Sequence, residues 1–148
     1  SMEIAVLALG CFWGPEIKFS KIEGVIKTEV GYCGGHSAVT NYKDVCSGTT
    51  NHAEVVKLDF DPKIISYEKI IEYFFEIHDP TTLNSQGPDF GTQYRSEIFY
   101  LNDKQKEIAE NMIKKENIKL SGKVVTKISL LKNYCPAEEY HQRYLEKR

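Results

Sequence analysis

Hydrophobic residues follow two spacings along this chain, and together the two spacings predict a mixed α+β fold. Short runs that are apolar or alternating are typical of strands, and they occur at residues 4–9, 25–30, 53–60 and 96–101. Apolar residues three or four positions apart predict helices at residues 15–22, where Pro15 suits the first turn, and at residues 66–78, where Ser66 suits the N-cap. The resulting order is strand, helix, strand, strand, helix, strand.

That order is typical of the ferredoxin-like β-α-β-β-α-β core, a two-layer α+β sandwich of helices on a sheet. Three further elements are predicted after it: a helix at residues 102–118, a fifth strand at 123–131 and a last helix at 136–146. Asn102 and Gln105 have the spacing of a capping box at the start of the first of these. We therefore expect helices packed on a mixed sheet.

Two long segments interrupt this pattern, at residues 31–52 and 79–94, and both are rich in Gly, Thr, Asn and Asp. Loops longer than about 12–15 residues in a compact domain are usually functional or disordered. These two carry Tyr42 and Tyr94 among other aromatic and apolar residues, a composition that does not fit disorder. We therefore interpret them as functional loops.

The composition fits one domain spanning residues 1–148, of which 41% are hydrophobic. A net charge of −2, from 19 basic and 21 acidic residues, gives no reason to expect nucleic acid or a lipid surface as a partner. No apolar run approaches the roughly 20 residues that cross a bilayer. Ser1 ahead of Met2 is typical of an expression remnant, and no signal-peptide pattern follows it. We expect a cytoplasmic monomer.

The four cysteines carry the first chemical signal, and they are Cys11, Cys33, Cys46 and Cys135. Their spacings contain no C-x-x-C pair and match no zinc site, and stable disulfides are not expected in a reducing cytosol. Cys11 differs from the others because it lies between a predicted strand and the helix that Pro15 helps to start. Backbone N–H groups and the helix dipole there favour an anion, so we expect the pKa of this thiol to fall below roughly 8.5.

The neighbours of Cys11 and one acidic residue extend that signal. Phe12 and Trp13 are adjacent, so both rings cannot face inward from a regular element, and at least one should face a pocket. Glu54 enters an otherwise apolar strand beside Val55, where a buried carboxyl with a raised pKa is a proton donor. No histidine lies in a diagnostic motif, and a plain structural role is the better prediction for each. A thiolate, a protonated carboxyl and tyrosine hydroxyls suit attack on an electrophile that loses an oxygen.

Six blocks of sequence resemble the A-type peptide methionine sulfoxide reductases, in that family's order and over nearly the whole chain. They are "GCFWG" at 10–14, "GYCGG" at 31–35, "YKDVCSGTTNHAEVV" at 42–56, "HDPTT" at 78–82, "GTQYRSEIF" at 91–99 and "PAEEYHQRYL" at 136–145. One block alone is a weak signal, whereas six in order are highly specific. The resemblance implies the ferredoxin-like fold and reduction of the S epimer of methionine sulfoxide, free or in proteins, with no metal and no bound cofactor.

The resemblance also implies a role for each matching residue. Cys11 matches the nucleophile that attacks the sulfoxide sulfur, and Glu54 matches the acid that protonates the sulfoxide oxygen. Tyr42 and Tyr94 match the tyrosines that hydrogen-bond the sulfoxide oxygen in the family. Phe12 and Trp13 match the apolar residues that contact the substrate methyl group, and Asp89 matches an aspartate on the polar side of the pocket. The reaction leaves Cys11 as a sulfenic acid, which thiols can still reduce.

The route back to the thiol is where this chain departs from common relatives. Many of them carry a resolving cysteine in a tail beyond the last helix, and this chain ends at Arg148. Cys33 and Cys135 are the possible internal resolving cysteines, whereas we interpret Cys46 as structural. The alternative, slightly favoured, is direct reduction of the sulfenic acid by thioredoxin, glutaredoxin or a glutathione-type thiol. Asn51 is a second departure, because the family tends to have Gly there.

Two other function classes stay open at this point. A cysteine-dependent acyl transferase or amidase, with His52 as base, also needs a reactive thiol but turns over without a reductant. A non-catalytic module that binds oxidised methionine needs the rings and tolerates Cys11→Ser. Consumption of one thiol equivalent per cycle distinguishes a reductase from both.

Overall fold

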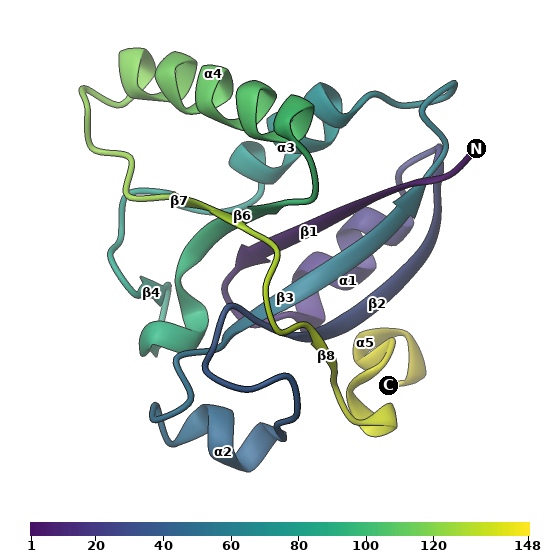
Figure 1. The fold of residues 1–148 in the computed structure, drawn as a ribbon, viewed down its shortest axis with the longest axis vertical. Coiled ribbons are helices and arrows are strands. Elements are labelled where there is room, and N and C mark those ends of the chain that lie inside the picture. The colour runs from purple at the N-terminus through teal and green to yellow at the C-terminus, as the bar shows by residue number, and fades with distance from the viewer.

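A six-stranded mixed sheet forms the centre of the molecule in the computed structural model, which describes residues 1–148 (Figure 1). Its strands are β1 (Glu3–Leu9), β2 (Val25–Cys33), β3 (Ala53–Phe60), β6 (Ser96–Tyr100), β7 (Lys127–Leu130) and β8 (Cys135–Pro136). The α-helices are α1 (Trp13–Ser20), α2 (Tyr42–Cys46), α3 (Tyr67–Glu76), α4 (Asp103–Lys119) and α5 (Tyr144–Lys147). A small hairpin, β4 (Ser85–Gln86) and β5 (Asp89–Phe90), and two 3-10 turns, η1 (Thr92–Tyr94) and η2 (Glu139–His141), complete the structure.

The strand order across the sheet is β7-β6-β1-β3-β2-β8. All neighbouring strands are antiparallel except β6 and β7, which are parallel. The predicted strands and helices of the first hundred residues are present in the predicted order, with α2 and the β4–β5 hairpin inserted in the two long loops. The mixed α+β class is therefore confirmed.

Two helices begin where the sequence predicts. Ser66 caps α3, its hydroxyl accepting from the Lys69 N–H at 3.1 Å, and Asn102 caps α4, its carbonyl accepting from the Gln105 N–H at 2.9 Å. The return half of the predicted capping box is absent, because the Gln105 amide accepts from the Leu101 N–H and donates to the Ile4 carbonyl. That side chain therefore joins α4 to β1 instead of closing the cap.

Alternation along the central strands divides the core between the two faces of the sheet. Leu7 and Leu9 of β1 face the larger cluster, which includes Phe19 of α1 and the apolar faces of α3 and α4. Val6 and Ala8 face the other side, where the segment after β7 crosses the sheet (Figure 1). Tyr134 packs against the smaller cluster that these two residues belong to. No helix has the length and apolar character needed to cross a membrane.

The predicted helix over residues 136–146 is wrong. The chain there forms the short strand β8, the turn η2 and, only at the end, the one-turn helix α5. Pro136 pairs with Gly31 at the sheet edge, and the Gln142 side chain bonds both the N–H and the carbonyl of Val30. Arg143 then adopts a left-handed conformation with φ 50°. Pairing with the β2 edge thus outweighs the helical pattern, and the predicted strand 123–131 shortens to Lys127–Leu130.

A third apolar cluster lies at the end of β2 and positions the predicted site. It packs Phe12 against Val30 and Tyr32 of β2, Val45 of α2 and Ala137 beyond β8. In Figure 1, α2 and α5 both lie at the lower edge of the molecule, away from α3 and α4. The residues of the site therefore come together where segments distant in sequence meet.

Candidate active site

A tight turn between β1 and α1 carries Cys11. Gly10 begins the turn with φ 97°, and a Cβ at this position would lie 2.9 Å from the Gln86 side chain. Glycine meets both demands, because it adopts positive φ without strain and adds no atoms. Helix α1 begins at Trp13, so Cys11 and Phe12 form the turn itself.

Glu54 lies beside this turn from the second residue of β3. Its side chain is 1% exposed, and its Oε1 accepts a hydrogen bond from the Phe12 N–H at 3.2 Å. Burial raises the pKa of this carboxyl from an ordinary 4.5 to about 8, although the Phe12 bond acts in the opposite direction. The predicted rise is confirmed, and Glu54 carries a proton at neutral pH.

The predicted fall in the pKa of Cys11 is wrong. Burial raises the pKa of this half-buried thiol to about 11, while the Trp13 N–H lowers it and the Glu54 and Asp89 carboxyls raise it further. The hydrogen bond from the helix terminus therefore lowers the pKa of the thiol as expected, but the loss of hydration raises the pKa by a larger amount. Cys11 is a neutral thiol in the resting protein.

Asp89, Tyr94 and Tyr42 complete the polar side of the site. Asp89 lies in β5 and Tyr94 in η1, and Glu54, Asp89 and Cys11 are close enough to raise the pKa of the Tyr94 hydroxyl further when they ionise. Burial is the main cause that raises the pKa of Tyr94 to about 12. A hydrogen bond with the Cys46 side chain is the main cause that raises the pKa of Tyr42, and burial is the second. Glu54 and Tyr94 raise this pKa further. Both phenols therefore keep their protons, and the structure brings both functional loops to Cys11.

The two adjacent aromatic residues have different environments. Phe12 is 1% exposed, with its ring 5.8 Å from that of Tyr32 and 5.2 Å from that of His141. Trp13 is half-buried and stacks on Tyr144, with ring centroids 3.9 Å apart. The indole of Trp13 is therefore the accessible ring of the pair, and Phe12 forms the wall behind it.

The cysteines are all reduced, and they differ in exposure. Cys33 is fully buried and its thiol donates to the Lys132 carbonyl at 3.3 Å, whereas Cys135 is half-buried, 3.7 Å from the Thr40 carbonyl. Cys46, interpreted from the sequence as structural, is exposed at the end of α2. Besides Cys11, Cys46 is the cysteine that acts on the site, because its side chain interacts with Tyr42 and acts on Cys11.

Sequence reasoning missed three residues that hold the site together. Arg95 donates to the Asn51 carbonyl at 3.0 Å and to the Thr92 carbonyl at 2.9 Å, so one guanidinium joins the loop before Glu54 to the turn carrying Tyr94. Glu138 accepts from the Tyr42 N–H at 2.9 Å and fixes the start of α2.

The third of these residues is His141, which accepts from the Trp13 indole N–H at 3.1 Å. The blocks "GTQYRS" and "PAEEYHQ" contain all three residues. No local spacing marks any of them, because each acts on a segment distant in the chain.

His52 does not act as a base in this arrangement. Its Nε2 lies 2.7 Å from the Ser37 carbonyl and its Nδ1 accepts from the Gly35 N–H at 3.1 Å, so both ring nitrogens are occupied. Its role is structural, as predicted for the histidines, and the acyl-transfer alternative loses its base.

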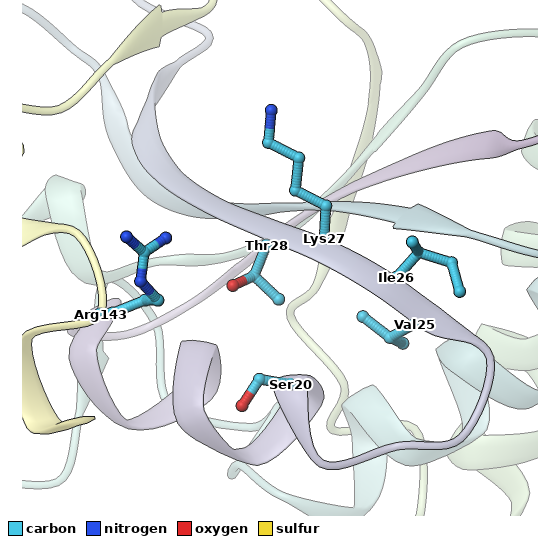
Figure 2. A pocket seen from close by; sticks show the side chains of 6 residues that line it. All are labelled: Ser20, Val25, Ile26, Lys27, Thr28 and Arg143. Carbon is cyan, nitrogen blue, oxygen red and sulfur yellow. The ribbon is translucent and has the colours of Figure 1, made fainter.

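A separate hollow of about 220 Å³ lies between α1 and β2 (Figure 2). Its walls are Ser20, Val25, Ile26, Lys27, Thr28 and Arg143. None of the residues assigned to chemistry lines it. The residues predicted for chemistry therefore lie around the turn at Cys11 and not in this hollow.

Comparisons with known proteins match the chain over nearly its full length. The family model described as peptide methionine sulfoxide reductase matches residues 3–148. A protein of Pelagibacter ubique named peptide methionine sulfoxide reductase MsrA is 85% identical over 147 residues, which cover 99% of this chain and 100% of the relative. A protein of the same name from Saccharolobus solfataricus is 51% identical, covering 99% of this chain and 82% of the relative.

Solved structures of related proteins superpose on this chain over nearly its full length. Mxr1 from Saccharomyces cerevisiae in its reduced form superposes with a TM-score of 0.96 at 40% identity, covering 99% of this chain and 86% of that chain. Mxr1 in complex with Trx2 superposes with a TM-score of 0.69 at 27% identity, covering 97% of this chain and 84% of that chain. A full-length family match and these identities place the chain among oxidoreductases that act on methionine sulfoxide. The chain therefore belongs to the peptide methionine sulfoxide reductase family, in its MsrA type.

Proposed function

We propose that this enzyme reduces the S epimer of methionine sulfoxide, free or in proteins, with Cys11 as nucleophile and Glu54 as proton donor. One observation carries the proposal: a buried, protonated carboxyl lies against the cysteine turn, its Oε1 3.2 Å from the Phe12 nitrogen. An S=O oxygen leaves poorly unless it is protonated, and acid catalysis of that kind contributes typically 10²–10⁴-fold.

The proposed reaction transfers the sulfoxide oxygen to the Cys11 sulfur. The Cys11 sulfur attacks the sulfoxide sulfur while the Glu54 proton moves to the sulfoxide oxygen. The oxygen then passes to the Cys11 sulfur as the S–O bond of the substrate breaks, which releases methionine and leaves a sulfenic acid. The proton of the Cys11 thiol restores Glu54. Sulfur in the substrate is reduced by two electrons, and the Cys11 sulfur is oxidised by two.

The surrounding residues divide the binding of the substrate between them. Tyr42 and Tyr94 keep their protons and donate to the sulfoxide oxygen, with Asp89 on the same polar side. Trp13, backed by Phe12, receives the methyl group, which distinguishes methionine sulfoxide from bulkier sulfoxides. The support for this division is that the polar groups interact with one another and with Cys11, while the indole stays accessible.

An outside thiol completes the cycle in this proposal. It attacks the sulfenic acid, releases water and forms a mixed disulfide that a second thiol resolves. Cys33 and Cys135 are the internal alternatives, but Cys33 is buried and bonded to Lys132, and Cys135 lies against Thr40. We assign the outside role to a thioredoxin, glutaredoxin or glutathione-type thiol, and we place the enzyme in the cytoplasm, where such thiols are abundant.

We also assign the fold to the ferredoxin-like class within the mixed α+β architecture. The support is that β6, β1, β3 and β2 are adjacent and antiparallel, with α1 and α3 as the two connecting helices. β7 and β8 then extend this core at its two edges.

The stoichiometry of one turnover tests the function. Reduced enzyme is mixed with excess methionine-S-sulfoxide and no reductant, and the methionine formed and the thiols remaining are counted per chain. We expect one methionine and one lost thiol, and none of either with the R epimer or with Cys11→Ser. Two lost thiols would indicate an internal disulfide, and the absence of methionine with all thiols intact would overturn the proposal. Cys46→Ser is the matched control for losing a cysteine.

A further inference from the structure

A side-chain hydrogen bond joins the two ends of the loop at residues 79–94, which carries Asp89 and Tyr94 of the proposed site. His78 directly precedes this loop, and Ser96 begins β6 just after it. The Nε2 atom of His78 lies 2.8 Å from the Ser96 Oγ. The contact therefore closes the loop at its base.

The other ring nitrogen of His78 sets the direction of this bond. Nδ1 lies 2.6 Å from the Phe74 carbonyl, which can only accept, so Nδ1 carries the ring proton. In the neutral ring Nε2 is then the acceptor, and the Ser96 hydroxyl donates to it. The Thr126 hydroxyl, 2.7 Å from the Ser96 Oγ, donates in turn to Ser96. This chain of bonds joins the residue after α3 to β6 and to the segment before β7.

The surroundings of His78 keep the imidazole neutral and in place. The rings of Phe74 and Phe75 lie 4.4 and 6.3 Å from it, the second stacked at 18°. Burial lowers the pKa of His78 from 6.5 to about 4, while the Phe74 bond and the Asp79 carboxyl act in the opposite direction. The acceptor that Ser96 needs is consequently present at neutral pH.

Ser96 lies between the loop and the strand that leads to Cys11. Its backbone pairs with Leu9 of β1, two residues before Cys11. On the other side, Tyr94 in η1 is two residues ahead of Ser96. The bond from His78 therefore fixes a residue that is close in the chain to Tyr94 and close across the sheet to the cysteine turn.

Internal bonds in the loop carry the position of its ends to its middle. The Gln86 amide accepts from the Asp79 N–H at 2.9 Å and donates to the Asp79 carbonyl at 2.8 Å. The same side chain lies against Gly10, so the loop is in contact with the turn that carries Cys11. Because the loop is bonded within itself, a change at its base also changes where its site residues lie.

We propose that His78 is a positioning residue, whose bond to Ser96 closes the base of the loop at residues 79–94 and thereby holds the Tyr94 hydroxyl at Cys11. The inference rests on the proposed function, which assigns Tyr94 as a donor to the sulfoxide oxygen. His78 itself has no contact with the reacting atoms in this proposal.

Two amide variants separate the roles of the two ring nitrogens. In His78→Gln the longer side chain brings an amide oxygen close to the position of Nε2 and keeps an acceptor for Ser96. In His78→Asn the shorter side chain reaches only the position of Nδ1, so it keeps the Phe74 bond and loses the Ser96 bond. His36→Asn, at an exposed histidine, is the matched control.

Steady-state kinetics with methionine-S-sulfoxide give the first readout. We expect kcat/KM to fall about 10- to 100-fold in His78→Asn, because a small misplacement of a group that contacts substrate is costly. His78→Gln should restore most of this loss, and His36→Asn should show none. Equal losses in the two His78 variants, or no loss in His78→Asn, would overturn the proposal.

A double-mutant cycle tests whether the effect passes through Tyr94. Once Tyr94→Phe has removed the hydroxyl, adding His78→Asn should lower kcat/KM by less than about twofold more. Fold-changes that multiply would instead indicate a general loss of structure, and they would overturn the positioning role.

Hydrogen exchange followed by mass spectrometry measures closure of the loop without any substrate. The Tyr94 N–H is bonded within the loop, to the Gly91 carbonyl at 3.0 Å. We expect peptides from residues 79–94 to exchange at least about tenfold faster in His78→Asn than in the wild-type protein or in His78→Gln, while the central strands stay protected. Unchanged exchange in His78→Asn would overturn the proposed closure.

The two readouts separate this inference from the proposed function. If the wild-type enzyme forms no methionine, the proposed function fails, while hydrogen exchange still tests the bond between His78 and Ser96. If methionine forms and kcat/KM does not respond to His78→Asn, only the positioning role fails. Should His78→Asn not fold, Ser96→Ala removes the same bond from the other side and must give the same faster exchange and lower kcat/KM; wild-type behaviour in Ser96→Ala would overturn the proposal.

Discussion

The backbone N–H of Phe12 donates to the carboxyl of Glu54 at 3.2 Å, across 42 residues of sequence. This contact fixes a proton donor directly beside the turn that carries Cys11, and burial keeps the donor protonated at neutral pH. The proposed nucleophile and its proposed acid are therefore joined through a main-chain atom, whose position does not depend on a flexible side chain. Most of the expected behaviour of the site follows from this pair.

Glu54→Gln should lower kcat by 10²–10⁴-fold and change KM little, because the amide preserves shape and the Phe12 contact but supplies no acidic proton. Wild-type kcat should fall as pH rises through about 8, where the carboxyl loses its proton. Both are measured by methionine formation between pH 6 and 9.5. The exposed Glu23→Gln is the control, and a variant that keeps full activity at pH 7 would contradict the role of Glu54.

The same carboxyl should make stability depend on pH in an unusual direction. Its pKa is raised from 4.5 to about 8 in the folded state, so between those values the folded protein holds a proton that the unfolded chain has released. The free energy of unfolding must then fall as pH rises across this window. We expect the wild-type Tm to drop by several degrees more than that of Glu54→Gln between pH 5 and 8, as measured by calorimetry. Parallel curves for the two proteins would contradict the raised pKa.

Recycling should survive the loss of both internal candidates. Cys33→Ser/Cys135→Ser should form methionine repeatedly with a small thiol, at a rate within about threefold of the wild-type rate. The physical reason is that the outside thiol reaches the sulfenic acid of the half-buried Cys11 directly. The measurement is methionine formed per chain over many cycles, with each single variant as control. A double variant that stops after one methionine would show that an internal cysteine resolves the sulfenic acid.

Arg95 and Glu97 form a buried ion pair at 2.6 Å, and breaking it should be costly. Arg95→Ala leaves a buried carboxylate without its partner and frees the carbonyls of Asn51 and Thr92, so we expect a loss of about 3–5 kcal/mol in the free energy of unfolding. Arg95→Leu/Glu97→Leu should recover part of that loss. Urea unfolding measures both. Lys69→Ala, which breaks an exposed pair with Glu72, should cost at most about 1 kcal/mol.

Asn51 has φ 59°, a left-handed conformation that glycine adopts without strain. Asn51→Ala should therefore cost about 1–2 kcal/mol, since a Cβ is strained there without the local hydrogen bonding that asparagine offers. Asn51→Gly should be nearly neutral. Urea unfolding tests both, with the exposed Lys43→Ala as control. Equal stabilities for the Ala and Gly variants would contradict strain at this position.

Local signals in the sequence were sufficient for most of the elements. Alternation gave β3 at the predicted residues 53–60, and Ser66 and Asn102 marked the starts of α3 and α4, because capping and burial act over a few neighbouring positions. An acidic residue inside an apolar strand was enough to predict a raised pKa for Glu54. The family blocks likewise identified the class of reaction.

Interactions between distant segments decided the rest. The segment after Pro136 pairs with Gly31 and Val30 instead of forming the predicted helix, because the edge of β2 offers backbone partners that the local pattern does not encode. The pKa of Cys11 rises because burial outweighs the helix terminus, and burial depends on what the whole chain places around the sulfur. The sequence did not reveal the roles of Arg95 and His141 either, because these roles lie in contacts with Asn51 and Trp13. Only the tertiary structure creates those contacts.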